Sequence, residues 1–408
     1  MKRNLILLAM LGACASINAE TLNVTCKNPM NVSRTDVPIV IDVRGKNVHS
    51  AKVELNGAEQ IYQADDLNGD GKVDELCFLA DFGKKESKTF TVTLSDNGEF
   101  TTFPNNRVYA EMLLNNPKEK GKRQTSYISG LTVDDDVNPY NLLQHHGPAF
   151  ETELVAYRIY FDNRQTVDIY GKYRKGLEIK QTQFYPTKDE LANGFGDDCL
   201  WVGSTLGVGT LRGWDGSKPH FLDKVSHRTE RILSRGPLRT VVEVVDNNWD
   251  TYNAGKPRVD LHTLYILYAG HRDLEIKARF LQPTDDYTLC TGVINVKNST
   301  EYTDKKGLRG CWGTDWPVSE KDSAGHKRET VGLAVCIAKD NFKQDLPSDK
   351  DNYPVLVSPK QNEINYHVAF CSDNENFGFH SDKDWYKWMQ EWKKELDNPV
   401  VVKIDYMK

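Results

Sequence analysis

Cationic and phenolic side chains share one face of two adjacent predicted strands. Residues 157–161 and 167–172 alternate apolar with polar side chains on either side of a tight turn at 162–165. Because successive side chains of a strand point to opposite faces, one face is apolar and the other is polar. The side chains on the polar face that are suited to catalysis are Arg158, Tyr160, Tyr170 and Lys172. They predict the floor of a polar, aromatic cleft that suits an acidic sugar; a charged face exposed to water is the alternative.

Two histidines precede these strands. His145 and His146 stand in a loop that continues into Gly147-Pro148. Imidazole titrates near neutral pH, so either ring is a candidate general acid or base. A histidine that only caps the loop is the alternative. The spacing of zinc enzymes is absent, and no organic cofactor is expected.

The polar face and the histidine pair contain the groups that elimination from a uronic acid requires. A cation, Arg158 or Lys172, would neutralise the sugar carboxylate and so make the C5 proton acidic. His146 or Tyr160 would remove that proton, and Tyr170 or the other histidine would protonate the departing oxygen. Tyrosine can act as the base only where a neighbouring cation lowers its pKa. We therefore predict an enzyme, a dehydratase or lyase.

Further polar and aromatic residues lie on predicted turns and strands farther along the chain. Tryptophan on a turn can stack on the apolar face of a sugar, and carboxylates accept hydrogen bonds from sugar hydroxyls. A tryptophan on a turn is as often part of the core. The candidate substrate-binding residues are Glu151, Trp201, Arg239, Glu243, His262, Trp312 and Asp315.

An Asp-rich loop predicts a structural calcium site. Oxygen-bearing side chains recur at alternate positions, and Gly71 permits a sharp turn. The twelfth position is Cys77, so the loop departs from a full EF-hand and is closer to a hairpin variety closed at its ninth position. An Asx-rich turn without metal is the alternative. The candidate ligands are Asp66, Asn68, Asp70, Lys72 (through its backbone carbonyl) and Asp74.

Strand patterns dominate the chain and predict a mostly β fold. β-branched or alternating runs predict strands at 39–43, 51–55, 88–94, 107–112, 240–245, 261–267, 275–280, 332–337 and 364–370. One helix is predicted at 385–396, after Ser381 with the residue order of a capping box. We expect a small β-sandwich at 20–100 and one large antiparallel β domain at 101–408, with the helix packed on it.

The beginning of the chain predicts export. Lys2 and Arg3 precede an apolar run and a cleavage site at Ile17-Asn18-Ala19, so residues 1–19 are expected to be a signal peptide and the protein periplasmic. A lipobox ending at Cys14 is the alternative and would make an outer-membrane lipoprotein. No later run predicts a transmembrane helix. The net charge of −6 argues against a nucleic-acid partner.

Several of these motifs together resemble a known family of unknown function. They are His146-Gly147-Pro148, Glu151, the strand 156–160, the turn 236–239 and the loop 66–75. Members of the family are secreted proteins encoded among bacterial glycan-utilisation genes. The resemblance implies a galactose-mutarotase-like β-supersandwich, a superfamily that includes sugar epimerases, while related sandwiches form domains of polysaccharide lyases.

Together, these observations predict an exported enzyme of polysaccharide degradation that acts on uronic-acid-containing oligosaccharides by elimination. An epimerase or mutarotase using His146 and Glu243 is the second hypothesis. A non-catalytic carbohydrate-binding protein is the third. A hydrolase would need two carboxylates, for which Glu151 and Glu243 are the candidates. The oligomeric state is not predicted.

Overall fold

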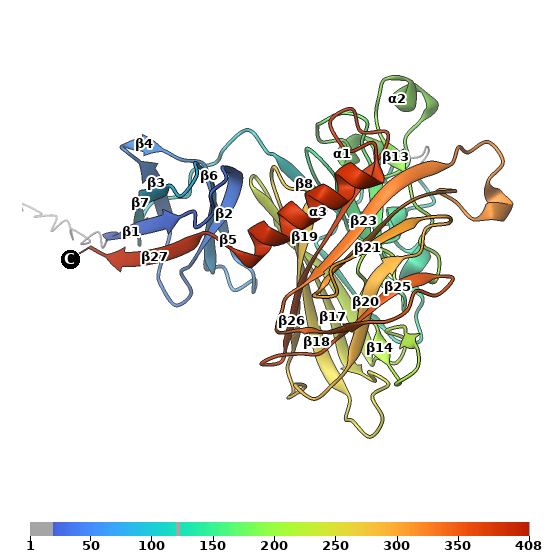
Figure 1. Ribbon diagram of the computed structural model, residues 1–408. Helices are drawn as coiled ribbons and strands as arrows, with labels where there is room; N and C mark the ends of the chain where they lie inside the picture. Colours follow the sequence, from blue (N-terminus) through green and yellow to red (C-terminus); the bar gives the residue numbers. More distant parts are fainter. Residues whose placement is uncertain (1–18, 120–122, 408) are drawn as a thin grey trace, which may run out of the picture.

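The computed structural model describes residues 19–119 and 123–407 as a mostly β protein with two lobes (Figure 1). The predicted signal peptide, with Cys14, lies outside the described residues except for Ala19, which begins the first strand. Within the described ranges, no helix is both long and apolar enough to span a membrane. The predicted fold class is confirmed: a small N-terminal β-sandwich precedes a large antiparallel β-supersandwich that carries a C-terminal helix.

The N-terminal sandwich consists of a five-stranded sheet, in the order β27-β1-β7-β3-β4, facing a three-stranded sheet, β2-β6-β5. Alternate residues of β1, such as Leu22 and Val24, are buried between the two sheets with Ile39 of β2 and Phe90 of β7. The strands are β1 (Ala19–Lys27), β2 (Arg34–Asp42), β3 (Ser50–Leu55), β4 (Ala58–Glu59), β5 (Tyr62–Asp65), β6 (Glu75–Phe82), β7 (Ser87–Ser95) and β27 (Val401–Tyr406).

Strand β27 joins the two ends of the chain in one sheet. It pairs antiparallel with β1, from Leu22 opposite Tyr406 to Lys27 opposite Val401. Figure 1 shows this last strand, in red, leaving the large lobe and running along the blue β1. The prediction that 101–408 form one domain is therefore wrong for β27, which belongs to the N-terminal sandwich.

A nine-stranded antiparallel sheet forms the back of the large lobe, in the order β21-β22-β23-β26-β19-β18-β17-β16-β9. Val242 and Val244 of β17 face the interior of the lobe, whereas Val241 and Glu243 face outward. The strands are β9 (Gly130–Asp134), β16 (His227–Arg235), β17 (Arg239–Trp249), β18 (Val259–Tyr268), β19 (Asp273–Phe280), β21 (Thr300–Thr303), β22 (Leu308–Asp315), β23 (Glu329–Ile337) and β26 (Glu363–Ser372).

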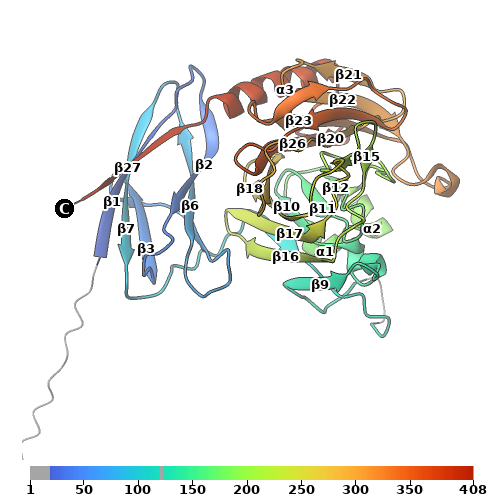
Figure 2. The ribbon, with the colours of Figure 1, turned by 90° about the horizontal axis from the view of Figure 1, so that it is seen from below.

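Two smaller sheets cover the inner face of the nine-stranded sheet (Figure 2). Tyr157 and Ile159 of β11 join Val242 and Val244 in one hydrophobic core. The five-stranded sheet contains β13 (Asp197–Asp198), β12 (Val167–Gly171), β11 (Ala156–Ile159), β10 (Ala149–Thr152) and β8 (Val108–Glu111). The three-stranded sheet contains β20 (Leu289–Ile294), β25 (Asn352–Val357) and β24 (Phe342–Asp345), and β14 (Gly213–Trp214) pairs with β15 (Pro219–His220).

The predicted C-terminal helix is α3 (Asp382–Asp397). The hydroxyl of its N-cap, Ser381, accepts a hydrogen bond from the Asp384 backbone N–H. Trp385, Met389 and Trp392 lie on one side of the helix and are buried against β22, β23 and β26. Two short helices, α1 (Ile179–Thr182) and α2 (Lys188–Ala192), belong to the segment that follows β12.

Candidate functional site

Arg158 is the centre of a buried cluster of polar side chains. Strands β11 and β12 pair with Arg158 directly opposite Asp168, so both side chains lie on one face of the sheet. Arg158 Nη2 donates to Asp168 Oδ2 at 2.6 Å and to Asp198 Oδ2 at 2.9 Å. The centroid of the Phe184 ring lies 4.2 Å from the guanidinium carbon. Arg158 is only 3% exposed, so its guanidinium lies beneath the side chains that surround it.

Tyr160 extends this cluster. Arg158 Nη2 donates to Tyr160 Oη at 2.8 Å, and the Tyr160 hydroxyl donates to Asp168 Oδ2 at 3.0 Å. Burial raises the pKa of Tyr160 well above its usual value; the nearby Arg158 opposes that shift without cancelling it. Tyr160 is therefore a protonated phenol, which disfavours the predicted role of this residue as a base.

Aromatic rings and a second guanidinium lie on the more exposed side of the cluster. The His146 ring stacks on Tyr140 with 3.7 Å between centroids, and the Tyr160 ring lies 6.0 Å from His146. The guanidinium carbon of Arg164 lies 5.0 Å from the centroids of both tyrosine rings. Arg164 comes from the turn between β11 and β12, and its Nε and Nη2 donate to Asp162 Oδ2 at 2.8 and 2.6 Å. Its side chain is 23% exposed, so the site presents a partly exposed guanidinium, paired with Asp162, beside an imidazole.

The hydrogen bonding of His146 determines which ring nitrogen carries its proton. His146 Nδ1 lies 2.8 Å from the backbone carbonyl oxygen of Tyr140. A carbonyl oxygen can only accept, so Nδ1 donates and carries the hydrogen. Burial, with smaller contributions from Arg158, His145 and Arg164, lowers the pKa of His146 to about 4. At neutral pH the ring is therefore uncharged, with the lone pair on Nε2, as a general base requires.

Tyr185 completes the cluster. Its hydroxyl oxygen accepts a hydrogen bond from Arg158 Nη1 at 3.0 Å, and burial raises the pKa of Tyr185. The residue is 36% exposed and carries a proton that it can donate. The His146 cluster is defined as Tyr140, His146, Arg158, Tyr160, Arg164, Asp168, Tyr185 and Asp198.

Lys172 and Glu151 form a buried ion pair that holds the covering segment in place. Lys172 Nζ donates to Glu151 Oε2 at 2.5 Å and to the carbonyl oxygen of Gly176 at 2.5 Å. Glu151 accepts the backbone N–H groups of Glu178 and Ile179, where α1 begins. Neither side chain is exposed to solvent. The polar atoms of both predicted site residues are therefore hydrogen-bonded to protein groups.

Tyr170 and His145 are likewise buried and paired with protein groups. The Tyr170 hydroxyl donates to the carbonyl oxygen of Gly196 at 2.8 Å, and burial raises its pKa. His145 Nε2 lies 3.2 Å from Glu111 Oε1, and both side chains are fully buried. Of the six predicted catalytic residues, the structure gathers His146, Arg158 and Tyr160 in one cluster, whereas Tyr170, Lys172 and His145 surround it as supports.

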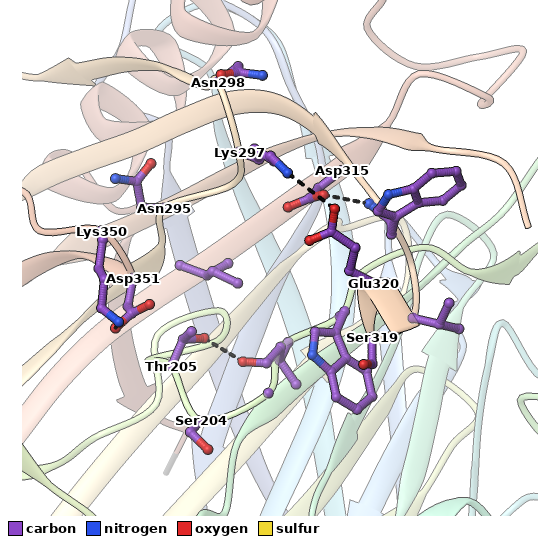
Figure 3. A pocket seen from close by; sticks show the side chains of 16 residues that line it. Ser204, Thr205, Asn295, Lys297, Asn298, Asp315, Ser319, Glu320, Lys350 and Asp351 are labelled. Carbon is purple, nitrogen blue, oxygen red and sulfur yellow. Dashed lines mark hydrogen bonds and ion pairs between the residues drawn. The ribbon is translucent and has the colours of Figure 1, made fainter. Parts of the chain in front are cut away.

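A pocket of about 640 Å³ contains two of the predicted substrate-binding residues (Figure 3). Trp201 and Asp315 line it together with Trp316, Lys297 and Glu320. Trp312, which was also predicted to bind substrate, lies on β22 outside this pocket and packs against α3. We call this cavity the Trp201 pocket; its remaining lining residues are Val202, Gly203, Ser204, Thr205, Ile294, Asn295, Asn298, Val318, Ser319, Lys350 and Asp351.

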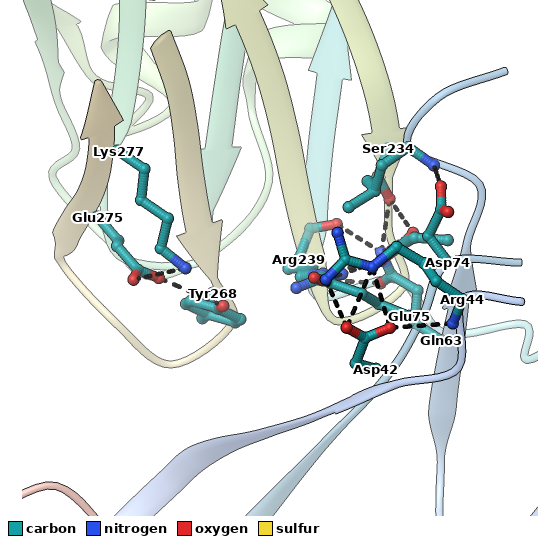
Figure 4. A network of polar contacts seen from close by, with 12 residues as sticks. Asp42, Arg44, Gln63, Asp74, Glu75, Ser234, Arg239, Tyr268, Glu275 and Lys277 are labelled. Atoms are coloured by element: carbon teal, nitrogen blue, oxygen red, sulfur yellow. Dashed lines mark hydrogen bonds and ion pairs between the residues drawn. The ribbon is translucent and has the colours of Figure 1, made fainter. Parts of the chain in front are cut away.

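Arg239, another predicted substrate-binding residue, instead joins the two lobes (Figure 4). Its Nε donates to Asp65 Oδ2 at 2.7 Å, and its Nη2 donates to Glu75 Oε2 at 2.7 Å. Gln63 Oε1 accepts the backbone N–H groups of Leu238 and Arg239. The turn 236–239 on which the family resemblance rested is therefore a docking point for the N-terminal sandwich.

Glu243 and His262 lie on the outer face of the nine-stranded sheet. His262 Nδ1 is 3.2 Å from Glu243 Oε1, and Arg231 Nε donates to Glu243 Oε2 at 2.8 Å. The His146 cluster lies on the outer face of the opposite sheet, with the hydrophobic core between them. His146 and Glu243 therefore cannot flank one sugar, which removes the geometric basis of the second hypothesis; the hydrolase pair Glu151 and Glu243 is separated in the same way.

The Asp-rich loop connects β5 to β6 and closes on its own backbone. Asp66 accepts the N–H groups of Gly69 and Gly71, and Asp74 accepts those of Leu67 and Asn68. Asn68 and Asp70 accept N–H groups two residues on, from Asp70 and Lys72. Across the described ranges, no group of three or more His, Cys, Asp or Glu side chains is arranged to hold a metal ion. Calcium binding by this loop stays a prediction.

Sequence reasoning missed Tyr140, Arg164, Tyr185 and Asp198. Arg164 stands in the turn between the two predicted strands at 157–161 and 167–172, so its position in the sequence could have indicated that it belongs to the site. The other three reach the cluster from separate segments, and their contacts arise only in the folded chain.

The fold and these two sites define a two-lobed, mostly β protein with a histidine–arginine–tyrosine cluster and a tryptophan-lined pocket. The chain belongs to the family DUF4861, a domain of unknown function, whose family model matches residues 26–402. No curated protein matches the chain.

Two solved structures resemble the chain over 94% of its length at 9% sequence identity. One is an alpha-mannosidase from Enterococcus faecalis V583, with a TM-score of 0.42, and the other is a protein in the glycosyl hydrolase family 38 from Enterococcus faecalis, with a TM-score of 0.46. The chain spans 46% of the first protein and 47% of the second, under half of each.

Proposed function

We propose that this protein is a carbohydrate-active enzyme that acts on uronic-acid-containing oligosaccharides by elimination, with the His146 cluster as its active site. The observation that carries the proposal is a neutral His146 whose Nδ1 is fixed by a carbonyl oxygen and whose Nε2 is free to accept a proton. Arg164 stands beside it over the same tyrosine rings. A base next to an accessible cation suits the removal of a proton adjacent to a carboxylate.

In this proposal Arg164 binds the uronate carboxylate. Its guanidinium is 23% exposed and donates to Asp162, whereas that of Arg158 is 3% exposed and donates to Asp168, Asp198 and Tyr160. Neutralising the carboxylate lowers the pKa of the C5–H bond, because negative charge develops there as the proton leaves. Arg158 is then a positioning residue, which differs from the role that the sequence predicted for it.

His146 Nε2 takes the C5 proton, and the electron pair of that bond forms the C4–C5 double bond. The C4–O bond breaks at the same time, and the departing oxygen takes the proton of the Tyr185 hydroxyl. Arg158 Nη1, 3.0 Å from this hydroxyl, stabilises the phenolate that remains. Proton transfer through water returns both side chains to their starting states. The products are a 4,5-unsaturated uronate and either an alcohol, for a lyase, or water, for a dehydratase.

The test is ultraviolet absorbance of the new double bond during incubation with saturated and unsaturated uronic-acid oligosaccharides. We expect absorbance to rise with the wild-type protein. His146→Gln should slow the reaction by about 100-fold or more, which is the usual contribution of a general base. Arg164→Ala should cost about 100-fold, the usual effect of losing one group that stabilises developing charge.

The controls are His49→Gln, which alters an exposed histidine of the N-terminal sandwich, and Arg258→Ala, which alters an exposed arginine between β17 and β18. Both should retain wild-type rates. Arg158→Ala is a poor test because it leaves Asp168 and Asp198 without their buried partner and endangers the fold. A wild-type rate in His146→Gln would overturn the proposal. If the absorbance stays constant with every oligosaccharide tested while oligosaccharides still bind, a non-catalytic binding protein would be favoured.

A further inference from the structure

The Trp201 pocket has the size and the mixture of side chains of a sugar-binding site. Its volume of about 640 Å³ falls in the usual range of small-molecule sites. Four separate segments supply its walls: the turn after β13, the loop after β20, the loop after β22 and the loop before β25. Figure 3 shows amide, carboxylate, hydroxyl and ammonium groups around the same space as two indole rings.

Trp201 presents an open aromatic face to this pocket. It is 47% exposed, and within the described part of the chain its ring has no aromatic or cationic neighbour in contact. Gly203 has a positive φ of 51°, and a Cβ there would lie 3.2 Å from Trp201 Nε1, so the turn holds the indole closely. Trp316 differs, because the guanidinium of Arg328 lies 5.2 Å from its ring. Trp201 is therefore the ring available for stacking on a sugar.

The charges that line the pocket are nearly balanced, with an excess of carboxylates. Lys297 Nζ lies 3.8 Å from Glu320 Oε1, and Lys350 Nζ lies 3.8 Å from Asp351 Oδ2. Among the residues that the structure describes, no lysine or arginine lies within ion-pair distance of Asp315, and its Oδ1 accepts the backbone N–H of Trp316. The lining holds three carboxylates, of Asp315, Glu320 and Asp351, against two ammonium groups, so its net charge disfavours an incoming uronate. Sugar hydroxyls, in contrast, can donate to the Asp315 carboxylate.

The pocket adjoins the His146 cluster along the chain. Asp198, which binds Arg158, precedes Trp201 by three residues, so their Cα atoms are at most about 11 Å apart. The edges of the two sites at Asp198 and Trp201 therefore lie within the length of a short oligosaccharide.

We propose that the Trp201 pocket binds a neutral glycosyl residue of the same oligosaccharide whose uronate occupies the His146 cluster. The placement of a uronate in the His146 cluster rests on the proposed function. It makes the substrate a mixed oligosaccharide, in which a neutral sugar neighbours the uronic acid, and not a homopolymer of uronic acids.

The test is a ligand-observed nuclear magnetic resonance titration with methyl glycosides of rhamnose, xylose, galactose and mannose, and with methyl glucuronide. We expect at least one neutral glycoside to bind with millimolar affinity and methyl glucuronide to bind this pocket more weakly. Trp201→Ala should weaken binding of the neutral glycoside by about three- to tenfold, as expected for one lost stacking contact. Trp201→Phe should recover part of that loss. Tyr406→Ala, which alters another exposed aromatic residue, on β27, should change nothing.

Arg164→Ala separates the two proposals. This variant should bind the neutral glycoside as the wild type does while losing elimination. If elimination fails but neutral binding depends on Trp201, the binding site stands and the proposed reaction falls. If elimination occurs but no neutral glycoside binds, if Trp201→Ala binds unchanged, or if methyl glucuronide binds the pocket equally well, the inference is overturned.

Discussion

The protonation state of His146 follows from two neighbours that differ in kind. The carbonyl oxygen of Tyr140 fixes the hydrogen on Nδ1, and burial beside Arg158 and Arg164 keeps the ring neutral. A histidine in water would be partly protonated near pH 6.5. The surroundings of His146 thus keep its base form in a more acidic range.

This predicts the acid limb of the pH–rate profile. The protonated ring is the inactive form, so kcat/KM should rise with pH through about 4, the pKa of His146, and stay flat between about 5 and 7. The measurement is kcat/KM for elimination between pH 3.5 and 8, with circular dichroism to confirm that the protein stays folded. A half-maximal rate near pH 6.5 would show that His146 titrates as an ordinary histidine or is not the base.

Only some of the residues of the site could be predicted from the sequence. Strand alternation correctly predicted that Arg158 and Tyr160 share a face, because alternation is a local property. Alternation could not show that Lys172 forms an ion pair with Glu151, or that Tyr185, which follows α1, contacts Arg158. Pairing between segments distant in sequence depends on the tertiary fold.

Among the elements, the turn between β16 and β17 has a role that its sequence did not reveal. Its Arg239 is 1% exposed and is held between Asp65 and Glu75 of the N-terminal sandwich. Hydrophobic contacts surround it, since Cys77 of β6 packs with Val241 and Tyr268 of the large lobe. The two lobes are therefore joined by a buried ion pair within an apolar contact.

Arg239→Ala should destabilise the protein by about 3–5 kcal/mol, because it leaves the buried carboxylate of Asp65 without its cationic partner. The measurement is the midpoint of urea unfolding, with limited proteolysis between the lobes as a second readout. Arg235→Ala, which alters an exposed arginine at the end of β16, is the matched control and should change stability by less than about 0.5 kcal/mol. Equal midpoints for the two variants would contradict the docking role.

Most elements with a strong local pattern could be predicted. The eleven predicted strands overlap β2, β3, β7, β8, β11, β12, β17, β18, β19, β23 and β26, and the predicted helix lies within α3. Strand β27 was missed because it is a largely exposed edge strand. Its partner β1 lies at the other end of the chain, and no local pattern indicates such a pairing.

For the whole molecule, the Asp-rich loop lies at the junction of the lobes. Leu67, within the loop, packs against the apolar contact that contains Tyr268. The loop closes through N–H groups donated to Asp66 and Asp74, two of the carboxylates that a calcium ion would bind. A cation bound here would act on the stability of the junction and not on the chemistry.

From the sequence pattern we predict that calcium raises the melting temperature by several degrees relative to a chelator, since a ligand bound only to the folded state stabilises it. Asp70→Asn keeps the acceptor for the Lys72 N–H but removes the charge, and it should abolish the shift. The measurement is differential scanning fluorimetry with calcium, magnesium or a chelator, and Asp135→Asn, an exposed site near β9, is the control. An equal response of wild type and Asp70→Asn would exclude this loop as the calcium site.

The pairing of β27 with β1 also sets the order in which the protein can be completed. A ribosome makes β1 before the large lobe and β27 after it, so the edge of β1 stays open while the large lobe is synthesised. The N-terminal sandwich therefore cannot reach its final form during elongation, and its last hydrogen bonds form only after residue 406 has emerged. A prematurely terminated chain would carry an unpaired strand edge, the kind of surface on which chains aggregate.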